Sequence, residues 1–342
     1  MTYEISIIVP AYNAEKTIKK SLELILLEAT KLQSEIIVVD DKSTDNTAEI
    51  VKKFEDIKLI QLEKNLGAGN ARNIGADNSK YETLCFIDAD IEISKENSIL
   101  NLAKRLYKTE ETGSVCATQD LSNLNKDEWS SNFVCLKSCY GVDTINFEKE
   151  FSVCCSEFCV ISKKLFTKVG KWKALYDAGG EEFDMGYKIT KQNKKNIKIS
   201  GAMYSGYWCD FLTRSKRIIQ RTAKYTPLLF EKKKFDTTGS FATANQFYSS
   251  LITLIMISLF IFNFFIENLN IKLLIFILFT LQIFIESKFL LFATKNYGLK
   301  MFFFSLFGIQ GVNFAILLGF SLFVLNLAKQ LIKICFNIFV LK

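Results

Sequence analysis

Three long apolar stretches in the C-terminal part of the chain restrict its architecture more than any other feature. They are residues 247–266, 271–293 and 302–325. A helix needs about 20 residues to cross the hydrocarbon core of a bilayer. Three such stretches in succession are not typical of core helices in a soluble protein. We therefore predict a transmembrane region at 246–328, followed by a tail at 329–342 that lies partly in the membrane interface.

The positive charge of the chain is concentrated just before this region. The formal net charge is +7, and residues 211–245 alone contribute eight basic side chains against Glu231 and Asp236. A basic segment beside apolar helices is typical of attraction to anionic headgroups on the cytoplasmic side. We predict a basic interfacial segment at 211–245 and a multi-pass protein of the cell membrane. Its N-terminal part would face the cytoplasm, and we expect no nucleic acid partner.

Several residue types bear on chemistry by their number or placement. Histidine is absent, which excludes any mechanism that needs an imidazole. Nine cysteines without a signal peptide predict reduced thiols. The alternative is a metal held by two pairs with a spacing of four, Cys135 with Cys139 and Cys155 with Cys159. Glu286 is costly inside a bilayer, and we expect it to snorkel to the cytoplasmic interface.

The first 210 residues alternate strand and helix patterns, which predicts an α/β domain with a mostly parallel sheet flanked by helices. The predicted strands are residues 5–9, 35–40, 59–62 and 83–87. The predicted helices are residues 18–32, 44–54 and 70–76. Ligands of such sheets bind beyond the carboxyl ends of the strands. Those ends are therefore the place to look for chemistry.

Carboxylates follow two of these strands. Asp40 and Asp41 end the second strand, and Asp88 and Asp90 follow the fourth. Buried carboxylates are costly unless they meet a metal or a hydrogen-bonding ligand, although helix capping is an alternative for Asp40. An Asp-x-Asp pair can offer hard oxygen ligands to Mg²⁺ or Mn²⁺, whose other ligands include substrate phosphate oxygens.

A glycine-bearing segment, residues 65–73 (NLGAGNARN), leads into the third helix. Glycines such as Gly69 let backbone N–H groups approach an anion. Arg72 lies in the same segment, and a guanidinium there suits bidentate contact with a diphosphate. A solvated position for Arg72 is the alternative.

Four segments in this order resemble glycosyltransferase family 2, which has the GT-A fold: SIIVPAYNAEKTIKKSLE, IIVVDDKSTDNTAEIV, NLGAGNARNIG and CFIDADIEI. The resemblance is close over about the first 90 residues and looser to about 225. It implies a catalytic domain at 1–210 and inverting transfer from a nucleotide sugar. It also implies that Pro10, Tyr12 and Asp41 hold the nucleobase. Arg72 and Asp88 would then contact the donor, with Asp88 and Asp90 at the metal.

The same resemblance indicates where a general base lies. The family has a Gly-Glu-Asp-x-Asp-Leu-like motif, and residues 180–185 read GEEFDM. Glu182 stands where aspartate is usual, so its carboxylate is displaced by about one bond length and Glu181 is a rival. An acidic helix start favoured by the helix dipole is the alternative reading of both.

We therefore predict a metal-dependent inverting glycosyltransferase that uses a UDP- or GDP-sugar. Its acceptor would be a membrane-associated polyprenyl phosphate, glycolipid or lipid-linked glycan. The alternative is a non-catalytic membrane protein that uses a GT-A-like domain for sensing or scaffolding. Processive polymerisation is disfavoured because residues 217–225 lack the Gln-x-x-Arg-Trp motif of polymer synthases. A nucleotidyltransferase is disfavoured because its first strand should end in a glycine-rich turn.

Overall fold

The computed structural model divides the chain into two compact units. It describes residues 3–121, 128–139, 148–173, 180–206, 209–232 and 244–340. The sheet unit holds the described residues up to 121 together with 148–173 and 180–206, and the helical unit holds the rest. We predicted one domain over residues 1–210. The described segment 128–139 instead belongs to the helical unit.

The sheet unit is built on one nine-stranded sheet. Its strands are β1 (Glu4–Ala11), β2 (Gln33–Asp40), β3 (Ile57–Gln61), β4 (Thr83–Ile87), β5 (Ile91–Ile93), β6 (Thr112–Gln119), β7 (Glu148–Phe151), β8 (Phe158–Ser162) and β9 (Lys195–Gly206). The order is β3-β2-β1-β4-β8-β6-β9-β5, and β7 pairs with β9. The strands β1 to β4 are mutually parallel, as predicted. Beyond β4 the sheet is mixed, because β8 runs antiparallel to both of its neighbours.

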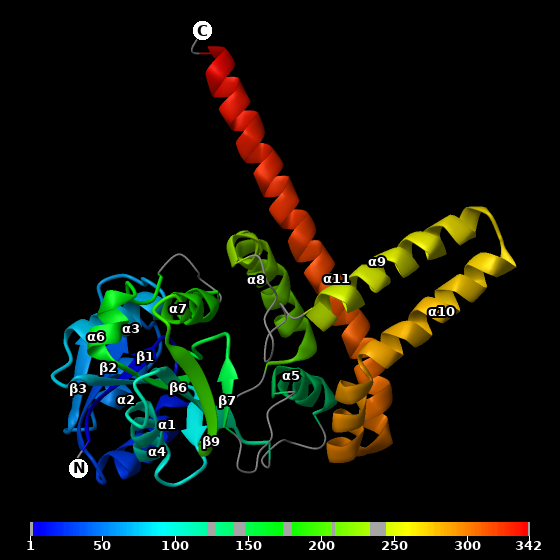
Figure 1. The fold of residues 1–342 in the computed structure, drawn as a ribbon. Helices are drawn as coiled ribbons and strands as arrows, with labels where there is room; N and C mark the ends of the chain where they lie inside the picture. The colour runs from blue at the N-terminus through cyan, green and yellow to red at the C-terminus, as the bar shows by residue number, and fades with distance from the viewer. Residues whose placement is uncertain are drawn as a thin grey trace. The chain divides into compact units, whose positions relative to one another are not determined.

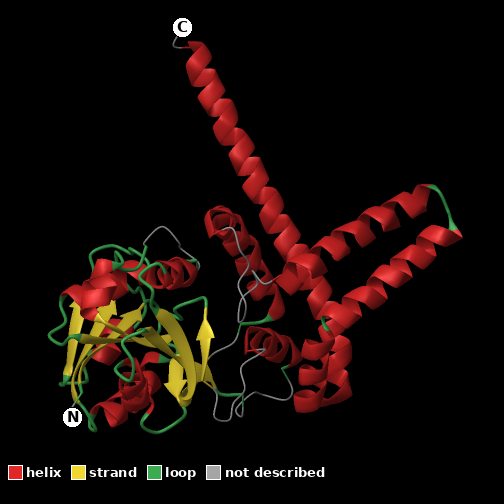
Figure 2. Ribbon diagram, in the orientation of Figure 1, coloured by secondary structure: helices red, strands yellow, loops and turns green. Residues whose placement is uncertain are grey.

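Helices cover both faces of this sheet (Figures 1 and 2). They are α1 (Ile18–Ala29), α2 (Thr47–Val51), α3 (Ala68–Asp77), α4 (Ser98–Leu106), α6 (Lys163–Lys168) and α7 (Glu181–Thr190). One face packs Ile5, Ile7 and Val9 of β1 against α1, α2 and α4. The other face packs β1, β4 and β8 against α3, α6 and α7. The near-continuous apolar strands follow from this burial on both sides.

The predicted strands and helices of the first 90 residues are confirmed, with one notable difference. Helix α2 is five residues long, whereas we predicted residues 44–54. Side chains hold the chain before α2 in a turn: the Thr44 amide donates to Asn13 Oδ1 at 2.8 Å, and the Thr47 amide donates to Asp45 Oδ1 at 3.0 Å. Asparagine and aspartate side chains that accept from backbone amides favour turns over helix interiors.

The helical unit contains five helices among the described residues. They are α5 (Trp129–Cys139), α8 (Phe211–Lys232), α9 (Ala244–Phe265), α10 (Leu269–Ile285) and α11 (Ser287–Val340). Within α11 the backbone leaves helical geometry at Gly298, whose φ is 77°. The two helical parts of α11 are therefore joined by a sharp break at Gly298, a conformation that glycine adopts without steric cost.

The apolar region matches our predicted spans only in part. The stretch 247–266 corresponds to α9, and 302–325 lies within α11 after Gly298. The second predicted span, 271–293, is wrong as one helix, because α10 ends at Ile285 and α11 begins at Ser287. By length and composition, Ala244–Phe265 and Ser287–Gln330 are candidate membrane spans, whereas Leu269–Ile285 is shorter. Large apolar side chains such as Phe264 and Phe265 are exposed on these helices, as a lipid contact surface requires.

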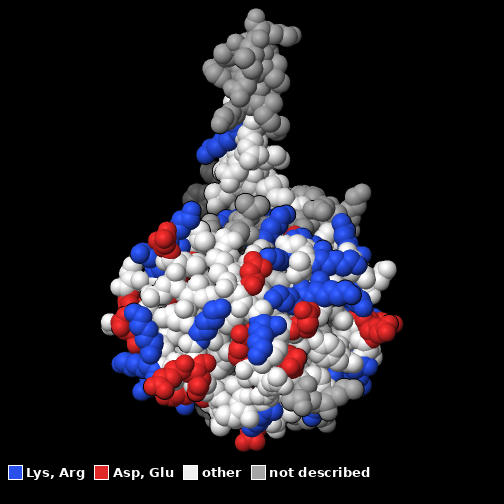
Figure 3. All heavy atoms as spheres, turned by 90° about the vertical axis from the view of Figure 1, so that its left-hand side faces the viewer, with Lys and Arg blue, Asp and Glu red and all other residues white. Residues whose placement is uncertain are grey.

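The backbone of the predicted tail, 329–342, continues α11 as a helix as far as Val340. The basic segment also has a regular part. Helix α8 exposes Lys216 and Arg217, while residues 233–243, with Lys233 and Lys234, lie outside the described residues. On the face drawn in Figure 3, basic and acidic side chains are interspersed.

Two further sequence interpretations are corrected. Glu286 does not snorkel, because its side chain is 6% exposed and forms an ion pair with Lys137. Cys155 and Cys159 do not share a helix face, since Cys159 lies on β8 opposite Cys116. The cysteines with described side chains are free thiols: Cys85, Cys116, Cys135, Cys154, Cys155, Cys159 and Cys209. The side chain of Cys139 lies outside the described residues.

Gly186 sets how closely α7 approaches the strand region that follows β7. A Cβ atom at Gly186 would lie 2.4 Å from the Ser152 carbonyl oxygen and 2.7 Å from Val153 Cα. Both neighbours are backbone atoms, so they cannot rotate away. We predict that Gly186→Ala lowers the free energy of unfolding by about 1–3 kcal/mol, as overpacking does.

Thermal unfolding of the detergent-purified protein measures this effect. The control is Gly206→Ala, because a Cβ there would have Ile91 Cγ2 at an ordinary 3.8 Å. Equal midpoints for the two variants would contradict the packing argument.

Candidate functional site

The candidate site lies at the carboxyl edge of the parallel strands. The backbone register pairs Ala11 at the end of β1 with Asp40 at the end of β2, and Asp88 directly follows β4. Helix α3 starts at Ala68 beside this edge and packs against β1 and β2. The topology therefore brings together strand ends that are up to about eighty residues apart in the sequence.

Asp41 holds the glycine-bearing segment in place. Its two carboxylate oxygens accept hydrogen bonds from the backbone amides of Leu66 and Gly67, each at 2.7 Å. Gly67 has a φ of 86°, which is the conformation that needs glycine. At Gly69, which we predicted to help bind the donor, an added Cβ would make ordinary contacts, at 3.7 Å, with Trp172 and Lys173. The Asp41 carboxylate thus shapes this loop.

Arg72 is buried and joins α3 to the end of β4. The residue is 2% exposed, and its Nη2 lies 2.5 Å from Asp88 Oδ1. Its guanidinium carbon is 5.7 Å from the centre of the Trp172 ring. The Nε and Nη1 atoms find no hydrogen-bond partner in the described structure. The solvated alternative for Arg72 is therefore wrong, and a buried guanidinium with two unsatisfied nitrogens suits an anionic partner.

The electrostatics place several carboxylates around this arginine. Burial opposes the charge of Arg72, but the Asp88 carboxylate beside it outweighs burial and raises the pKa of Arg72. Glu181 and Glu182 on α7 act in the same direction. Charges influence one another in this way only at short range in a protein. Arg72 is thus the positive centre of an acidic cluster.

Asp88 titrates unusually within this cluster. Burial raises the pKa of Asp88 to about 6, and the neighbouring Asp90 and Glu157 carboxylates also raise it, whereas Arg72 lowers it. The Asp88 backbone amide donates to the Glu157 carbonyl at 2.9 Å. Carboxylates that lie close together repel one another, and a cation bound between them lowers this repulsion. The negative charge of Asp90 and Glu157 beside Asp88 is what a bound cation would offset.

Glu181 and Glu182 open α7, as predicted, and differ in their surroundings. Glu182 Oε1 accepts from the Ser156 amide at 2.7 Å and from Ser156 Oγ at 3.1 Å. The Cys154 amide donates to the Glu182 carbonyl at 3.1 Å, which fixes the start of the helix. Glu181 Oε2 is buried without a hydrogen-bond partner in the described structure. Glu182 is thus the more firmly oriented of the two carboxylates.

The nucleobase residues that the resemblance implied differ in accessibility. Tyr12 is 51% exposed beyond the end of β1, so its ring is free to stack on a base. Pro10 is buried within β1 and contributes to the strand end rather than to a surface. Asn13 follows with a φ of 49° and holds the β2 turn through the Thr44 amide. The two strand turns therefore support each other beneath Tyr12.

Three residues of the cluster were missed from the sequence. Glu157 accepts hydrogen bonds from the Tyr204 hydroxyl and, at 3.3 Å, from Gln119 Nε2. Trp172 contacts Arg72, and its own amide donates to Asn73 Oδ1 at 3.0 Å. Ser156 orients Glu182. The available signal for Glu157 was its position just before β8, a strand whose antiparallel placement beside β4 we did not predict.

Among the described residues, no group of three or more acidic or cysteine side chains converges closely enough to form a complete metal site. Asp88 and Asp90 can therefore supply only part of a coordination shell. Mg²⁺ and Mn²⁺ sites in nucleotide-dependent enzymes commonly have one or two carboxylates, with water and phosphate oxygens as the remaining ligands. The residues present fit that incomplete type of site.

The mixed sheet and its acidic edge define a fold of the GT-A type. A mannosyltransferase from Pyrobaculum calidifontis, solved with GDP-Man and Mn²⁺, has a similar fold with a TM-score of 0.50 and 19% identity. That likeness covers 65% of this chain and 64% of the other. Residues 6–170 match the family model described as glycosyl transferase family 2. Residues 6–170 of this chain are therefore a glycosyltransferase family 2 domain.

Sequence relatives are found in bacterial glycan synthesis. The poly(ribitol-phosphate) β-N-acetylglucosaminyltransferase TarS of Staphylococcus aureus is 42% identical over 96 residues, which are 27% of this chain and 17% of TarS. The Escherichia coli enzyme WfgD, named as a UDP-Glc:α-D-GlcNAc-diphosphoundecaprenol β-1,3-glucosyltransferase, is 41% identical over 90 residues. Those residues are 26% of this chain and 35% of WfgD. The chain spans well under two thirds of these curated relatives.

We predict that Asp41→Asn destabilises the glycine-bearing loop, because an amide cannot accept from both the Leu66 and Gly67 N–H groups with charge assistance. The expected loss is about 1–3 kcal/mol in the free energy of unfolding. Thermal unfolding without any ligand measures it.

Asp56→Asn is the matched control, because Asp56 is exposed just before β3. If Asp41→Asn unfolded at the same temperature as wild type, the carboxylate would have no role in holding the loop.

Proposed function

We propose that this protein transfers a sugar from a nucleoside diphosphate sugar to a lipid-linked acceptor at a membrane. The observation that carries the proposal is the ion pair of the buried Arg72 with the partly buried Asp88, surrounded by carboxylates at the strand ends of a family 2 fold. The apolar helices of the same chain supply a reason for a lipid acceptor. The name of WfgD, whose acceptor is a diphosphoundecaprenol-linked sugar, supports this choice.

The donor would bind along the strand ends. Tyr12 offers an exposed ring for the UDP or GDP base, at the end of a strand shaped by Pro10. Asp41 contributes by holding the loop that leads into Gly69 at the start of α3, rather than by a free carboxylate. Arg72 would balance the charge of the diphosphate, through its unsatisfied nitrogens or through its hold on Asp88.

Asp88 and Asp90 are the residues that would hold a divalent cation, Mg²⁺ or Mn²⁺. Such an ion stabilises the negative charge that develops on a diphosphate leaving group. Burial raises the pKa of Asp88, and the Asp90 and Glu157 carboxylates raise it further; a divalent cation would offset the negative charge of these acids. Arg72 keeps Asp88 oriented at this point through its 2.5 Å contact.

The reaction would be a single displacement with inversion. The acceptor hydroxyl oxygen forms a bond to the anomeric carbon while the bond from that carbon to the diphosphate oxygen breaks. The hydroxyl proton passes to a carboxylate acting as general base. We assign this role to Glu182, since Ser156 fixes its orientation at 2.7 Å, and Glu181 is the alternative.

The helical unit would keep the protein at the bilayer. The net positive charge of residues 211–245 favours the cytoplasmic leaflet, so we propose that the sheet unit faces the cytoplasm. A multi-pass arrangement would use α9 and α11, the helices whose length and composition are sufficient.

Removal of the Asp90 carboxylate should abolish cation-dependent turnover. We predict that Asp90→Asn lowers kcat/KM for the nucleotide sugar by about 100-fold or more, since a transition-state charge loses its stabilisation. Release of the nucleoside diphosphate in the presence of Mn²⁺ measures this, after a thermal-shift panel has identified the donor.

Asp77→Asn is the control, because Asp77 is an exposed acid on α3 whose partner is Lys171. Wild-type turnover by Asp90→Asn would remove the cation site from the proposal. Absence of turnover with every nucleotide sugar in the wild type would favour a sensing or scaffolding protein.

The two candidate bases can be separated by isosteric variants. We predict that Glu182→Gln lowers kcat by about 100-fold or more with little change in donor affinity, because the proton acceptor is lost while the shape is kept. Glu181→Gln should retain most of the activity. The reverse result would assign the base to Glu181.

A further inference from the structure

The Asp-x-Asp segment, residues 88–90, joins β4 to β5 and is held at both of its ends by the sheet. At the near end, the Asp88 amide donates to the Glu157 carbonyl at 2.9 Å, just before β8 begins. At the far end, Ile91 of β5 pairs with Gly206 of β9. The distance between these two attachments limits where the carboxylates of the segment can lie.

The far attachment depends on an irregularity in β9. Ala117 of β6 pairs with Ile199, whereas the next residue, Thr118, pairs with Met203. A step of one residue in β6 corresponds here to a step of four in β9, so β9 contains three extra residues. Bulges of this kind bend a strand and change the direction of the side chains that follow. Tyr204 lies just beyond the bulge, on the part of β9 that pairs with β5.

A side-chain hydrogen bond joins the two attachments. The Tyr204 hydroxyl donates to Glu157 Oε2. Tyr204 pairs with Ile93 of β5 and so belongs to the far attachment, whereas the Glu157 carbonyl forms the near one. Gln119 Nε2 donates to the same carboxylate oxygen at 3.3 Å, and the centre of the Tyr204 ring is 6.1 Å from that of Phe158. The hydroxyl–carboxylate bond therefore closes a ring of contacts that contains the Asp-x-Asp segment.

This bond combines a buried hydroxyl with a charged acceptor. Tyr204 is 2% exposed, and the hydroxyl of a buried tyrosine usually has a hydrogen-bond partner. Hydrogen bonds to carboxylates are roughly twice as strong as those between neutral groups. The Glu157 carboxylate is also close enough to Asp88 to raise the pKa of that acid. Glu157 thus acts on Asp88 through its backbone carbonyl and through its charge.

We propose that the hydrogen bond between Tyr204 and Glu157 sets the span of the Asp-x-Asp segment and thereby the spacing of the Asp88 and Asp90 carboxylates. Tyr204 and Glu157 are then positioning residues for the divalent cation that these carboxylates would hold. Residues that orient metal ligands commonly affect metal affinity strongly. This inference deepens the proposed function, on which its cation readout rests, whereas hydrogen exchange tests it without any ligand.

The experiment compares variants of the full-length protein in the same detergent. Tyr204→Phe removes the hydroxyl and keeps the ring that packs on Phe158. Glu157→Gln keeps the shape of the side chain and removes its charge, and a double variant combines both changes. Tyr107→Phe is the matched control, because the hydroxyls of Tyr107 and Thr83 share a hydrogen bond at 2.7 Å at the opposite end of β4.

Mn²⁺ binding in the presence of UDP, and separately of GDP, is measured by electron paramagnetic resonance. We expect Tyr204→Phe to raise the Kd of Mn²⁺ by about tenfold. Glu157→Gln should raise it at least as much, because a negative charge near the cation is also lost. The double variant should lose less than the product of the two single effects, since both changes act on one bond. Tyr107→Phe should match the wild type.

Turnover supplies a readout that a merely structural bond would not move. The Mn²⁺ concentration for half-maximal turnover should rise in Tyr204→Phe by the same factor as the Kd. Excess Mn²⁺ should restore most of kcat, because the variant lacks cation affinity rather than a reacting group. Loss of kcat at every Mn²⁺ concentration, with a lower unfolding temperature, would reduce the bond to a general structural role and overturn the inference.

Hydrogen exchange tests the same bond without nucleotide or cation. The backbone amides of residues 88–93 should exchange faster in Tyr204→Phe and in Glu157→Gln, and at the wild-type rate in Tyr107→Phe. Wild-type exchange or wild-type Mn²⁺ affinity in Tyr204→Phe would overturn the inference. Multiplicative losses in the double variant would overturn it as well, because the two residues would then act separately.

These readouts separate failure of the inference from failure of the proposed function. If the wild type binds no Mn²⁺ with either nucleotide and transfers no sugar, the proposed function fails and takes the cation role with it. The exchange rates still report whether the bond holds the Asp-x-Asp segment. If the wild type binds Mn²⁺ and transfers sugar, and Tyr204→Phe does both equally well, the positioning role alone is wrong.

Discussion

The contact between the Arg72 guanidinium and the Asp88 carboxylate is the interaction on which the candidate site depends. It joins α3, which follows the glycine-bearing loop, to the end of β4, the strand that leads to Asp90. Burying either charge without the other would be costly, so the pair fixes the spacing between these two elements. The acids around the pair then create a region where positive charge is favourable.

The surrounding structure supports this pair at several points. Asp41 holds the loop before α3 through two backbone amides, and Ser156 orients Glu182 at the start of α7. In both cases backbone groups of another segment hold a carboxylate in place. A site whose groups are already held needs little reorganisation when a ligand binds. Arg72 and Glu182 therefore lie on helices, whereas Tyr12 and Asp90 are exposed.

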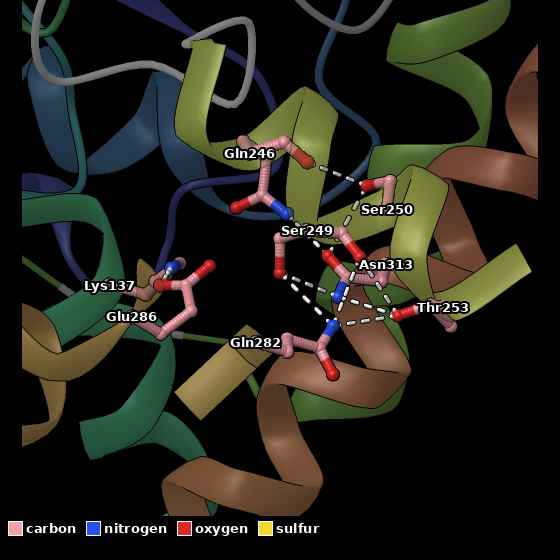
Figure 4. Close-up of polar contacts among 8 residues, drawn as sticks. All are labelled: Lys137, Gln246, Ser249, Ser250, Thr253, Gln282, Glu286 and Asn313. Atoms are coloured by element: carbon pink, nitrogen blue, oxygen red, sulfur yellow. Dashed lines mark hydrogen bonds and ion pairs between the residues drawn. The ribbon is translucent and has the colours of Figure 1, made fainter. Parts of the chain in front are cut away.

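The helical unit is stabilised differently from the sheet unit. Helices α9, α10 and α11 expose large apolar side chains, whereas the interior of the unit contains amide and hydroxyl side chains together with a buried ion pair (Figure 4). Apolar packing alone gives little preference for one arrangement of helices in lipid, because the helices and the lipid tails are similarly apolar. Directional hydrogen bonds supply that preference. They also tie α5, a segment inserted between two strands of the sheet, to the apolar helices.

The sequence by itself determined the parallel strands β1 to β4, the helices between them and the carboxylates at their ends. Each of these features follows from local periodicity or from the residues that end a strand. None of them depends on contacts between residues far apart in the sequence. It also indicated the acidic start of α7 through a family motif. Only the tertiary structure decided that Asp41 holds a loop, that Glu157 and Trp172 join the cluster, and that Glu286 pairs with Lys137. These outcomes depend on which segments meet in space, and Lys137 and Glu286 are 149 residues apart in the chain. No local pattern records such a partner, so the energy of a buried charge can be assessed only once the fold has placed its counterpart.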